Sequence, residues 1–389
     1  MYKKRSLSAH LKKMVTKFPI ISLTGPRQTG KTTLLRNEFK SYKYFNLERP
    51  DLRELIAGDP LGFLKNNGNK IIFDEVQNLP ELFSYIQVDS DENQILGKYI
   101  LSGSQSFLLN EKISQSLAGR VSINILLPFD MKEYSKLQES SVDELILSGF
   151  YPRLHDTNIG YSDFYPSYLQ TYIERDVRSL RGIENLNTFS RFLSLCAGRV
   201  GQILNLTSLA NDCGASVNTA KSWLSLLEAS YIIYQLRPYY KNINKRIIKS
   251  PKLYFYDTGV VCSLLRIKDK EMLRGHYLYG ALFENFIISE IIKRKYHSGT
   301  HPSVYYWRES NGTEIDCIIE EGVNSLSAIE LKGGHSYNSD YVRNLKIFEN
   351  LDKDVSVKSR VVYNGEVRSN VSGIEVINWR EFFRGVVSR

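Results

Sequence analysis

Short apolar runs alternate with polar or helical segments along the first third of the chain. The runs are residues 19–23, 44–47, 71–73 and 98–102, and a helical pattern follows the first of them. Alternating strands and helices predict a parallel, doubly wound sheet, which is an α/β fold. Ligands of such sheets bind at the carboxyl ends of the strands. The residues that follow each run are therefore the first candidates for chemistry.

Further along, the pattern becomes mainly helical. Residues 131–196 read as helices, and apolar side chains recur at helical spacing within residues 167–180. Residues 206–227 read as two helices, with Gly214 in a tight turn and Ser216 capping the second helix. This order predicts a helix-turn-helix.

Beyond these helices the chain reads as a hairpin with a strongly basic connection. Strands at 231–236 and 252–256 would complete a winged helix. Residues 237–252 hold six Lys or Arg and no carboxylate, with two tyrosines interleaved. Such a hairpin can follow a phosphate backbone and bind by releasing counterions. A solvated basic surface or a protein-binding winged helix is the alternative. The candidate nucleic-acid contacts are Lys221, Lys241, Lys245, Arg246 and Lys249.

The last third of the chain predicts a long helix followed by three strands. Residues 280–293 carry apolar side chains on one helical face. Strands are expected at 304–308, 313–319 and 326–332, and an Asn-Gly hairpin turn joins the first two.

Composition is that of an ordinary globular protein. The chain has 389 residues, of which 42% are hydrophobic and 24% charged, enough for roughly two to four domains. The formal net charge of +9 favours a polyanionic partner, and a merely basic protein is the alternative. Four scattered cysteines without a C-x-x-C pair disfavour disulfides and zinc and fit a cytoplasmic protein. We expect no signal peptide and no membrane span, because no apolar stretch approaches ~20 residues.

The strongest chemical signal is the loop after the first apolar run. It reads G-P-R-Q-T-G-K-T-T and fits the pattern G-x-x-x-x-G-K-S/T between a strand and a helix. Its glycines let backbone N–H groups turn inward around a phosphate, and the following helix directs its positive end at the anion. Lys31 would reach the β- and γ-phosphates, and Thr32 would offer its hydroxyl to Mg²⁺. The expected ATP-binding residues are Gly25, Pro26, Arg27, Gln28, Thr29, Gly30, Lys31, Thr32 and Thr33.

Two acidic residues follow a second apolar run. Asp74 and Glu75 come directly after residues 71–73, where a parallel sheet binds its ligand. Asp74 can hold Mg²⁺, and Glu75 can polarise the attacking water. Ser104 follows the next strand and could contact the γ-phosphate or the water, with a strand-capping serine as the alternative.

These motifs together resemble a prokaryotic family of AAA-type ATPases that carry a C-terminal domain of unknown function. The resemblance rests on G-P-R-Q-T-G-K-T-T, Y-F-N-L-E, I-F-D-E-V-Q-N-L-P, L-S-G-S-Q-S-F and S-L-A-G-R. It implies that Lys31 and Thr32 belong to Walker A and that Asp74 and Glu75 form Walker B. Ser104 then falls at the sensor-1 position.

The same resemblance assigns a role to Arg120. Such ATPases can present an arginine from this position to the γ-phosphate of a neighbouring subunit. If Arg120 acts in this way, hydrolysis needs a homo-oligomer, with a hexamer as one candidate size. An ordinary surface arginine is the alternative.

The C-terminal strands resemble the PD-(D/E)XK nuclease fold. Side chains alternate along a strand, so Glu330 and Lys332 share a face, and Asp316 can lie beside Glu330. The resemblance implies that Glu284, Asp316 and Glu330 hold a divalent metal ion, which activates water. Lys332 would orient that water or stabilise developing charge. Short motifs of this kind also arise by chance, and relatives of this fold can bind without cleaving.

These expectations combine into one reading of the chain. It has an ATPase core at 1–127, a helical lid at 128–195, a winged helix at 196–260 and a nuclease-like domain at 275–389. A polar linker is expected at 266–274. We expect a cytoplasmic, Mg²⁺-dependent ATPase that works on DNA as an oligomer. The alternative is an ATP-gated regulatory or defence protein whose C-terminal domain binds a protein or DNA partner without cleavage.

Overall fold

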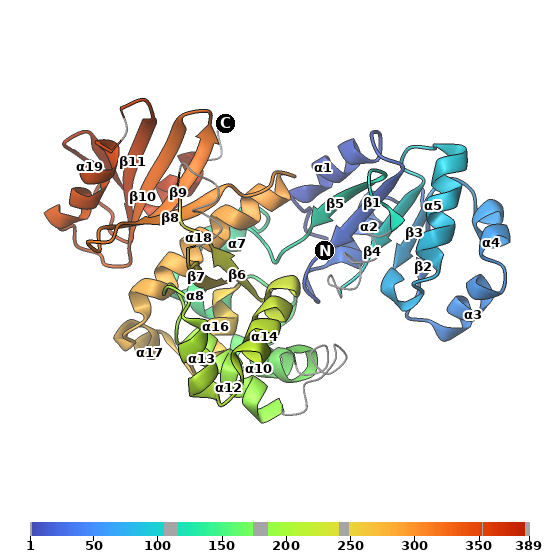
Figure 1. Cartoon of the computed structure of the whole chain (residues 1–389), viewed down its shortest axis with the longest axis horizontal. Helices are drawn as coiled ribbons and strands as arrows, with labels where there is room; N and C mark the ends of the chain where they lie inside the picture. The colour runs from blue at the N-terminus through green and yellow to red at the C-terminus, as the bar shows by residue number, and fades with distance from the viewer. Residues whose placement is uncertain (1, 105–115, 174–185, 241–248, 352, 386–389) are drawn as a thin grey trace.

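The computed structural model describes residues 2–104, 116–173, 186–240, 249–351 and 353–385. Figure 1 shows three regions in chain order: an N-terminal sheet with its helices in blue, a helical middle region in green and yellow, and a C-terminal sheet in orange and red. The two sheets lie on the right and left of this view, and the middle region lies between and below them. Within the described ranges, no helix combines the length and apolarity that crossing a membrane requires.

Five parallel strands form the N-terminal sheet in the described part of the chain. Their order is β2-β3-β4-β1-β5, and every neighbouring pair runs parallel. The strands are β1 (Ile20–Thr24), β2 (Lys43–Asn46), β3 (Ile71–Asp74), β4 (Tyr99–Ser102) and β5 (Val121–Ile125). The helices are α1 (Leu7–Met14), α2 (Lys31–Glu38), α3 (Pro50–Gly58), α4 (Pro60–Asn67), the 3₁₀ turn η1 (Val76–Asn78) and α5 (Leu82–Asn93).

Both faces of this sheet are buried. Alternate side chains along a strand point to opposite faces. Ile20 of β1 therefore enters one apolar core with Phe73 of β3, whereas Ile21 and Leu23 enter a second core with Ile72. The predicted doubly wound α/β sheet is confirmed, and the carboxyl ends of β1, β3 and β4 meet at one edge.

The middle region is mainly helical, as the periodicity predicted. Gly214 adopts a left-handed conformation with φ of 77° between α13 and α14, and the Ser216 side chain caps α14 by accepting from the N–H of Thr219. An antiparallel pair, β6 and β7, follows. The elements are α7 (Ser135–Glu139), α8 (Val142–Ser148), α9 (Pro152–Asp156), α10 (Tyr161–Tyr168), the π-helix η2 (Leu169–Ile173), α12 (Leu186–Ala197), α13 (Leu206–Cys213), α14 (Val217–Ala229), β6 (Ile233–Leu236), β7 (Lys252–Phe255), α16 (Thr258–Leu264) and α17 (Lys270–Gly275).

The segment predicted as a linker differs from that expectation. Residues 266–274 contain most of α17, whose first turn is capped by Asp269 accepting from the N–H of Met272. Leu273 is fully buried and anchors this short helix. Arg274 and Lys270 also pair with Asp143 and Glu144 of α8. Polar contacts thus help to dock this helix, which explains why the polar composition of the segment concealed it.

The C-terminal region is a mixed sheet with helices on its faces. In the described residues its strand order is β12-β13-β11-β10-β9-β8, antiparallel from β8 to β10 and parallel from β10 through β11 to β13. The elements are α18 (Tyr279–His297), β8 (Val304–Arg308), β9 (Glu314–Gly322), β10 (Ser325–Lys332), the 3₁₀ turn η3 (Ser339–Val342), α19 (Arg343–Glu349), β11 (Ser356–Tyr363), β12 (Ser369–Val371), β13 (Ile374–Asn378) and α20 (Trp379–Gly385).

The middle and C-terminal regions share one apolar core, which runs from Leu127 to Phe383. Helix α18 lies at its centre, where the ring of Phe286 packs 5.9 Å from that of Phe150 and 5.4 Å from that of Trp379. The backbone after β6 also pairs with β8, because the N–H of Tyr239 donates to the carbonyl of Tyr306 at 2.6 Å. The two regions therefore form a single packed unit.

Candidate functional site

The loop between β1 and α2 requires glycine at both ends. At Gly25, φ is +142°, and an added Cβ would lie only 2.2 Å from the carbonyl oxygen of Leu126. At Gly30, φ is +86°, and α2 begins at the next residue. Left-handed conformations of this kind favour glycine. The loop is thus fixed at the carboxyl end of β1 and against the chain after β5.

Lys31 curls back over this loop. Its Nζ donates to the carbonyls of Gly25 at 2.9 Å and Pro26 at 2.8 Å. Thr29 closes the same turn, since its Oγ1 donates to Pro26 at 2.9 Å. The ammonium group therefore lies within the loop whose backbone N–H groups a phosphate would contact.

Three hydroxyl groups donate hydrogen bonds to the carboxylate of Asp74 at the end of β3. Thr32 Oγ1 donates to Asp74 Oδ2 at 2.6 Å, and Tyr44 OH donates to the same oxygen at 2.7 Å. Ser102 Oγ donates to Asp74 Oδ1. Burial, followed by the hydrogen bond to Asp74, raises the pKa of Tyr44 well above its ordinary value, so the phenol stays protonated. Tyr44 and Ser102 belong to the quoted motifs Y-F-N-L-E and L-S-G-S-Q-S-F but were not predicted as site residues, because their contacts with Asp74 arise only when β2 and β4 pair with β3.

Glu75 is held by its own set of donors. Its Oε2 accepts from Ser104 Oγ at 2.9 Å, from Ser104 N at 3.2 Å and from Gln77 Nε2 at 2.6 Å. The backbone of Glu75 is left-handed, with φ of 53° and ψ of 44°. Non-glycine residues adopt this region at a cost of order 1 kcal/mol, and such strain clusters at functional sites. The hydroxyl of Ser104 thus lies on the carboxylate of Glu75.

A second group of charged residues forms where α18, β9 and β10 meet. Lys332 Nζ lies 2.7 Å from Glu330 Oε1 and 4.0 Å from Asp316 Oδ2. The backbone N–H of Leu331 donates to Asp316 Oδ2 at 2.8 Å. Glu284 of α18 interacts electrostatically with both carboxylates, so the structure brings the four predicted residues together.

Three further residues enter this cluster and were not predicted. Lys252 of β7 places its Nζ 3.1 Å from Glu284 Oε1 and also pairs with Glu314 of β9. Tyr254, two residues along β7, donates to Glu284. A lysine at the start of an otherwise apolar strand is the sequence signal that could have drawn attention to this position.

Carboxylates dominate the electrostatics of this cluster. Burial, followed by the charge of Asp316, raises the pKa of Glu330 to about 8. Burial raises the pKa of Glu284 to about 7 against the opposing charge of Lys252, and Asp316 adds to the rise. Both groups are poorly compensated, which is the electrostatic condition that favours an added cation.

Among the described residues, Asp130, Glu133 and His297 are the acidic or histidine side chains whose ligand atoms lie within 4.8 Å of one another. Both histidine nitrogens are already used. His297 Nδ1 lies 2.9 Å from Asp130 Oδ2, and Nε2 accepts from the N–H of Leu127 at 3.2 Å. This trio therefore serves to dock α18 rather than to hold a metal ion.

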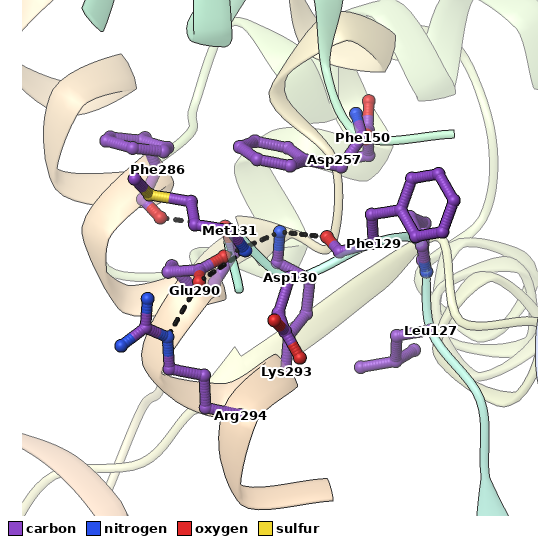
Figure 2. Close-up of polar contacts among 12 residues, drawn as sticks. Leu127, Phe129, Asp130, Met131, Phe150, Asp257, Phe286, Glu290, Lys293 and Arg294 are labelled. Carbon is purple, nitrogen blue, oxygen red and sulfur yellow. Dashed lines mark hydrogen bonds and ion pairs between the residues drawn. The ribbon is translucent and has the colours of Figure 1, made fainter. Parts of the chain in front are cut away.

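Figure 2 shows the neighbouring contacts of the same docking surface. Glu290 of α18 accepts from the N–H of Met131 at 2.9 Å, and Lys293 donates to the carbonyl of Phe129 at 2.9 Å. The chain that leaves the N-terminal sheet is thus fixed to α18 by buried charged groups.

Three family descriptions match the chain in succession. An AAA domain matches residues 17–135, and domains of unknown function match residues 139–271 (DUF8612) and 279–382 (DUF4143). Uncharacterised proteins of Mycobacterium bovis and Mycobacterium tuberculosis are each 31% identical to it over 327 residues, covering 82% of this chain and 72% of each relative. The chain belongs to this family of AAA-type ATP-binding proteins. The family expected from the sequence motifs is confirmed.

More distant similarities span most of this AAA-type protein. An uncharacterised protein of Methanocaldococcus jannaschii is 23% identical over 382 residues, covering 88% of this chain and 81% of the relative. Among solved structures, the Walker-type ATPase of Pyrococcus abyssi has 15% identity, covers 69% of this chain and 96% of its own, and gives a TM-score of 0.44. A RuvB structure of Thermotoga maritima has 16% identity, covers 59% and 87%, and gives a TM-score of 0.27.

Arg120 lies away from the other predicted nucleotide residues of this AAA-type protein. It precedes β5, and its carbonyl accepts from the N–H of Ile20, so it sits at the amino end of the sheet. Its guanidinium pairs with Asp91, with Nη2 2.9 Å from Oδ2. About a third of the side chain is exposed. Within its own subunit Arg120 does not face the loop.

Arg5 is a buried residue beside the nucleotide loop that the sequence did not single out. Its Nη1 donates to the carbonyl of Thr29 at 2.6 Å, Nη2 donates to the carbonyl of Leu127 at 2.7 Å, and Nε lies 2.9 Å from Glu133 Oε2. A cavity of about 440 Å³ opens beside it, lined by Gly30, Phe129 and other residues of both regions. No local motif marks Arg5, because its partners are distant in sequence.

The predicted nucleic-acid contacts are described only in part. Lys221 is exposed on α14, and Lys249 is exposed just before β7. Lys241, Lys245 and Arg246 lie outside the described residues.

Proposed function

We propose that this protein hydrolyses ATP with Mg²⁺ at the edge where β1, β3 and β4 end. The observation that carries the proposal is the meeting of Lys31, Thr32, Asp74 and Glu75 at that edge, with Thr32 Oγ1 2.6 Å from Asp74 Oδ2. Hydroxyl and carboxylate oxygens are the ligands that Mg²⁺ prefers. These two residues would hold the ion, which when bound would neutralise phosphate charge.

The residues of the loop would bind and orient the phosphates. Lys31 would exchange its bonds to the carbonyls of Gly25 and Pro26 for phosphate oxygens. Glu75 would accept a proton from the attacking water through Oε1, because Ser104 and Gln77 hold Oε2 in place. Ser104 on this view positions Glu75 and does not contact the γ-phosphate itself.

The remaining nucleotide residue would act between subunits. Arg120 lies on the surface of its own subunit, which supports contact with a neighbouring copy rather than with the same site. We therefore propose that hydrolysis requires a homo-oligomer, in which Arg120 leaves Asp91 and stabilises charge on the neighbour's γ-phosphate.

DNA is the partner that charge and architecture favour. The net charge is +9, and Lys221 and Lys249 are exposed on α14 and beside β7. Helices in this arrangement can enter a groove while a basic hairpin follows the phosphates. Asp316 and Glu330 would then hold a divalent cation near the DNA, Lys332 would orient the attacking water, and cleavage is the reaction that this set of residues could support.

A second function is favoured by one observation at the same cluster. Lys252 pairs with Glu284 and Glu314 and occupies part of the acidic cluster. The C-terminal region could therefore bind a protein or DNA partner under the control of ATP without cutting it.

Hydrolysis of ATP, measured with and without duplex or single-stranded DNA, tests the main proposal. We expect stimulation by DNA that the Lys31→Ala variant abolishes. Activity that ignores DNA, together with no DNA binding at low salt, would contradict the nucleic-acid part and favour a protein partner. Loss of cleavage in Asp316→Ala and Glu330→Ala variants would then separate nuclease activity from binding alone.

A further inference from the structure

The C-terminal cluster contains two lysine ammonium groups among its carboxylates. One of these side chains is fixed by its surroundings, and the other can move towards solvent. The carboxylates are Glu284, Glu314, Asp316 and Glu330, and the ammonium groups belong to Lys252 and Lys332. Arg308 reaches Glu314 from the solvent side, at 3.2 Å. When all four carboxylates are ionised, they outnumber these three cationic side chains by one, so the cluster can accept an added cation.

Lys252 is fixed in its place. Its side chain is 4% exposed, and its Nζ lies between Glu284, at 3.1 Å, and Glu314. Its backbone pairs with Leu236 of β6 on one side and bridges to Ile203 on the other. The strand cannot withdraw without losing both pairings, so the ammonium group is a permanent part of the cluster.

Lys332 has more freedom. It is the last residue of β10, and its side chain is 31% exposed. Its Nζ contacts Glu330 at 2.7 Å and reaches Asp316 only at 4.0 Å. A long side chain with this exposure can swing towards solvent at little cost.

Glu330 has an oxygen that needs a partner. The residue is 6% exposed, and in the described residues its Oε2 has no hydrogen-bond partner. Buried polar atoms without partners are rare in native proteins and call for an explanation. An ion bound between Glu330 and Asp316 would supply the missing contact once Lys332 moved aside.

We propose that the cluster binds a single divalent cation between Asp316 and Glu330, and that Lys252 permanently takes the place of a second cation beside Glu284 and Glu314. This inference rests on the proposed metal-binding role of the C-terminal region. In this proposal Glu284 is the ion-pair partner of Lys252 and not a ligand of the metal ion. Oxygen ligands of this type suit Mg²⁺ or Mn²⁺.

Counting bound Mn²⁺ on the full chain without nucleotide tests the proposal, for example by the electron paramagnetic resonance signal of free Mn²⁺. We expect the wild type to bind one more Mn²⁺ than the Asp316→Asn variant, and Glu330→Gln to lose the same ion. Glu284→Gln should keep it, with affinity lowered by at most about 10–100-fold, the range for a residue outside the ligand shell. Subtraction of Asp316→Asn removes any ion bound at Thr32 and Asp74.

The Lys252→Met variant tests the role of Lys252 by a gain of Mn²⁺ binding. Removing the fixed ammonium group should create a second Mn²⁺ site that Glu284→Gln abolishes in the double variant. Two Asp316-dependent ions in the wild type, loss of the ion in Glu284→Gln, or no difference between wild type and Asp316→Asn would each overturn the proposal. The wild-type count decides even if Lys252→Met fails to fold. Stimulation of ATPase by DNA is measured separately, so failure of the proposed function can be told from failure of this inference.

Discussion

Glu75 combines a strained backbone with a carboxylate held by three donors on one oxygen. In the proposed mechanism, that arrangement fixes the direction of the side chain, and Oε1 would act on water. If Glu75 acts as proposed, it contributes to the chemical step and little to binding of the ground state.

Replacing Glu75 with Gln should separate hydrolysis from binding. Loss of a general base costs roughly 10²–10⁴-fold in rate, so turnover should fall by about that factor while ATP affinity changes less than tenfold. Steady-state ATPase rates and titration with a fluorescent ATP analogue measure the two quantities. Glu81→Gln, at an exposed position after η1, is the matched control. Equal loss of binding and turnover would show that Glu75 has a structural role only.

Asp130 gives a prediction about acid stability. Burial by itself raises its pKa, but the hydrogen bond and electrostatic interaction with His297, followed by the charges of Arg294 and Lys293, lower it well below 3.8. A carboxyl group with a lowered folded-state pKa stabilises the protein above its unfolded pKa, and this stabilisation is lost as pH falls below about 4. Asp130→Asn should therefore be less stable than the wild type by about 1–3 kcal/mol at pH 7.

The pH series distinguishes this effect from simple loss of packing. The difference in free energy of unfolding between wild type and Asp130→Asn should shrink as pH falls from about 4 towards 2. Denaturant titrations at each pH measure it, with the exposed Asp340→Asn as control. A difference that stayed constant with pH would mean that the charge of Asp130 is unimportant.

At the scale of elements, the β1–α2 loop depends on close contact with the chain after β5. Gly25→Ala would place a Cβ 2.2 Å from the carbonyl oxygen of Leu126, with φ of +142°. Overpacking of this kind typically costs about 1–3 kcal/mol. We expect a lower melting temperature and weaker ATP binding, measured by thermal denaturation with and without nucleotide. Gly58→Ala is the control, because no atom lies within 4 Å of its added Cβ, and an equal effect in both variants would refute the argument.

Some site residues could be predicted from the sequence because of the strands in which they lie or which they follow. The loop residues and Asp74 could be predicted because each follows a strand within a few residues, and the parallel order then brings them together. Asp316 and Glu330 could be placed side by side from strand alternation alone, since β9 and β10 pair directly. In these cases the local sequence pattern and the geometry of the sheet are enough to predict which residues lie together.

The partners of other site residues could not be predicted. Lys252 is separated from Glu284 by 32 residues, and Arg5 from Leu127 by 122. These contacts arise when β7 packs on α18 and when the N-terminal segment crosses to the middle region. Such packing depends on the shared core, for which no local motif exists.

At the scale of the whole molecule, buried charged contacts join the nucleotide-binding sheet to the rest of the chain. Arg5 bonds to Thr29 in the loop and to Glu133, whose Oε1 lies 3.6 Å from Nδ1 of His297 at the end of α18. The opposite half of α18 carries Glu284, which pairs with Lys252. The nucleotide loop and the C-terminal cluster are thus attached to the same helix.

Substitution of Arg120 tests whether ATP hydrolysis requires more than one chain. Arg120→Ala should lower ATPase activity at least tenfold, because arginines that reach a neighbour's phosphate supply large rate factors. Arg49→Ala is the matched control, since Arg49 also forms an exposed pair with an aspartate, Asp51.

Mixing two inactive variants shows whether Arg120 acts on the neighbouring subunit or only pairs with Asp91. Arg120→Ala subunits keep an intact loop, and Lys31→Ala subunits keep Arg120, so a mixed oligomer contains interfaces where both are present. Activity should therefore reappear on mixing, in an amount that rises with the share of such interfaces, and steady-state ATPase assays across mixing ratios measure it. No recovery in oligomers shown to exchange subunits would mean that Arg120 serves only to pair with Asp91, because a residue acting between chains must be replaceable by the neighbour's copy.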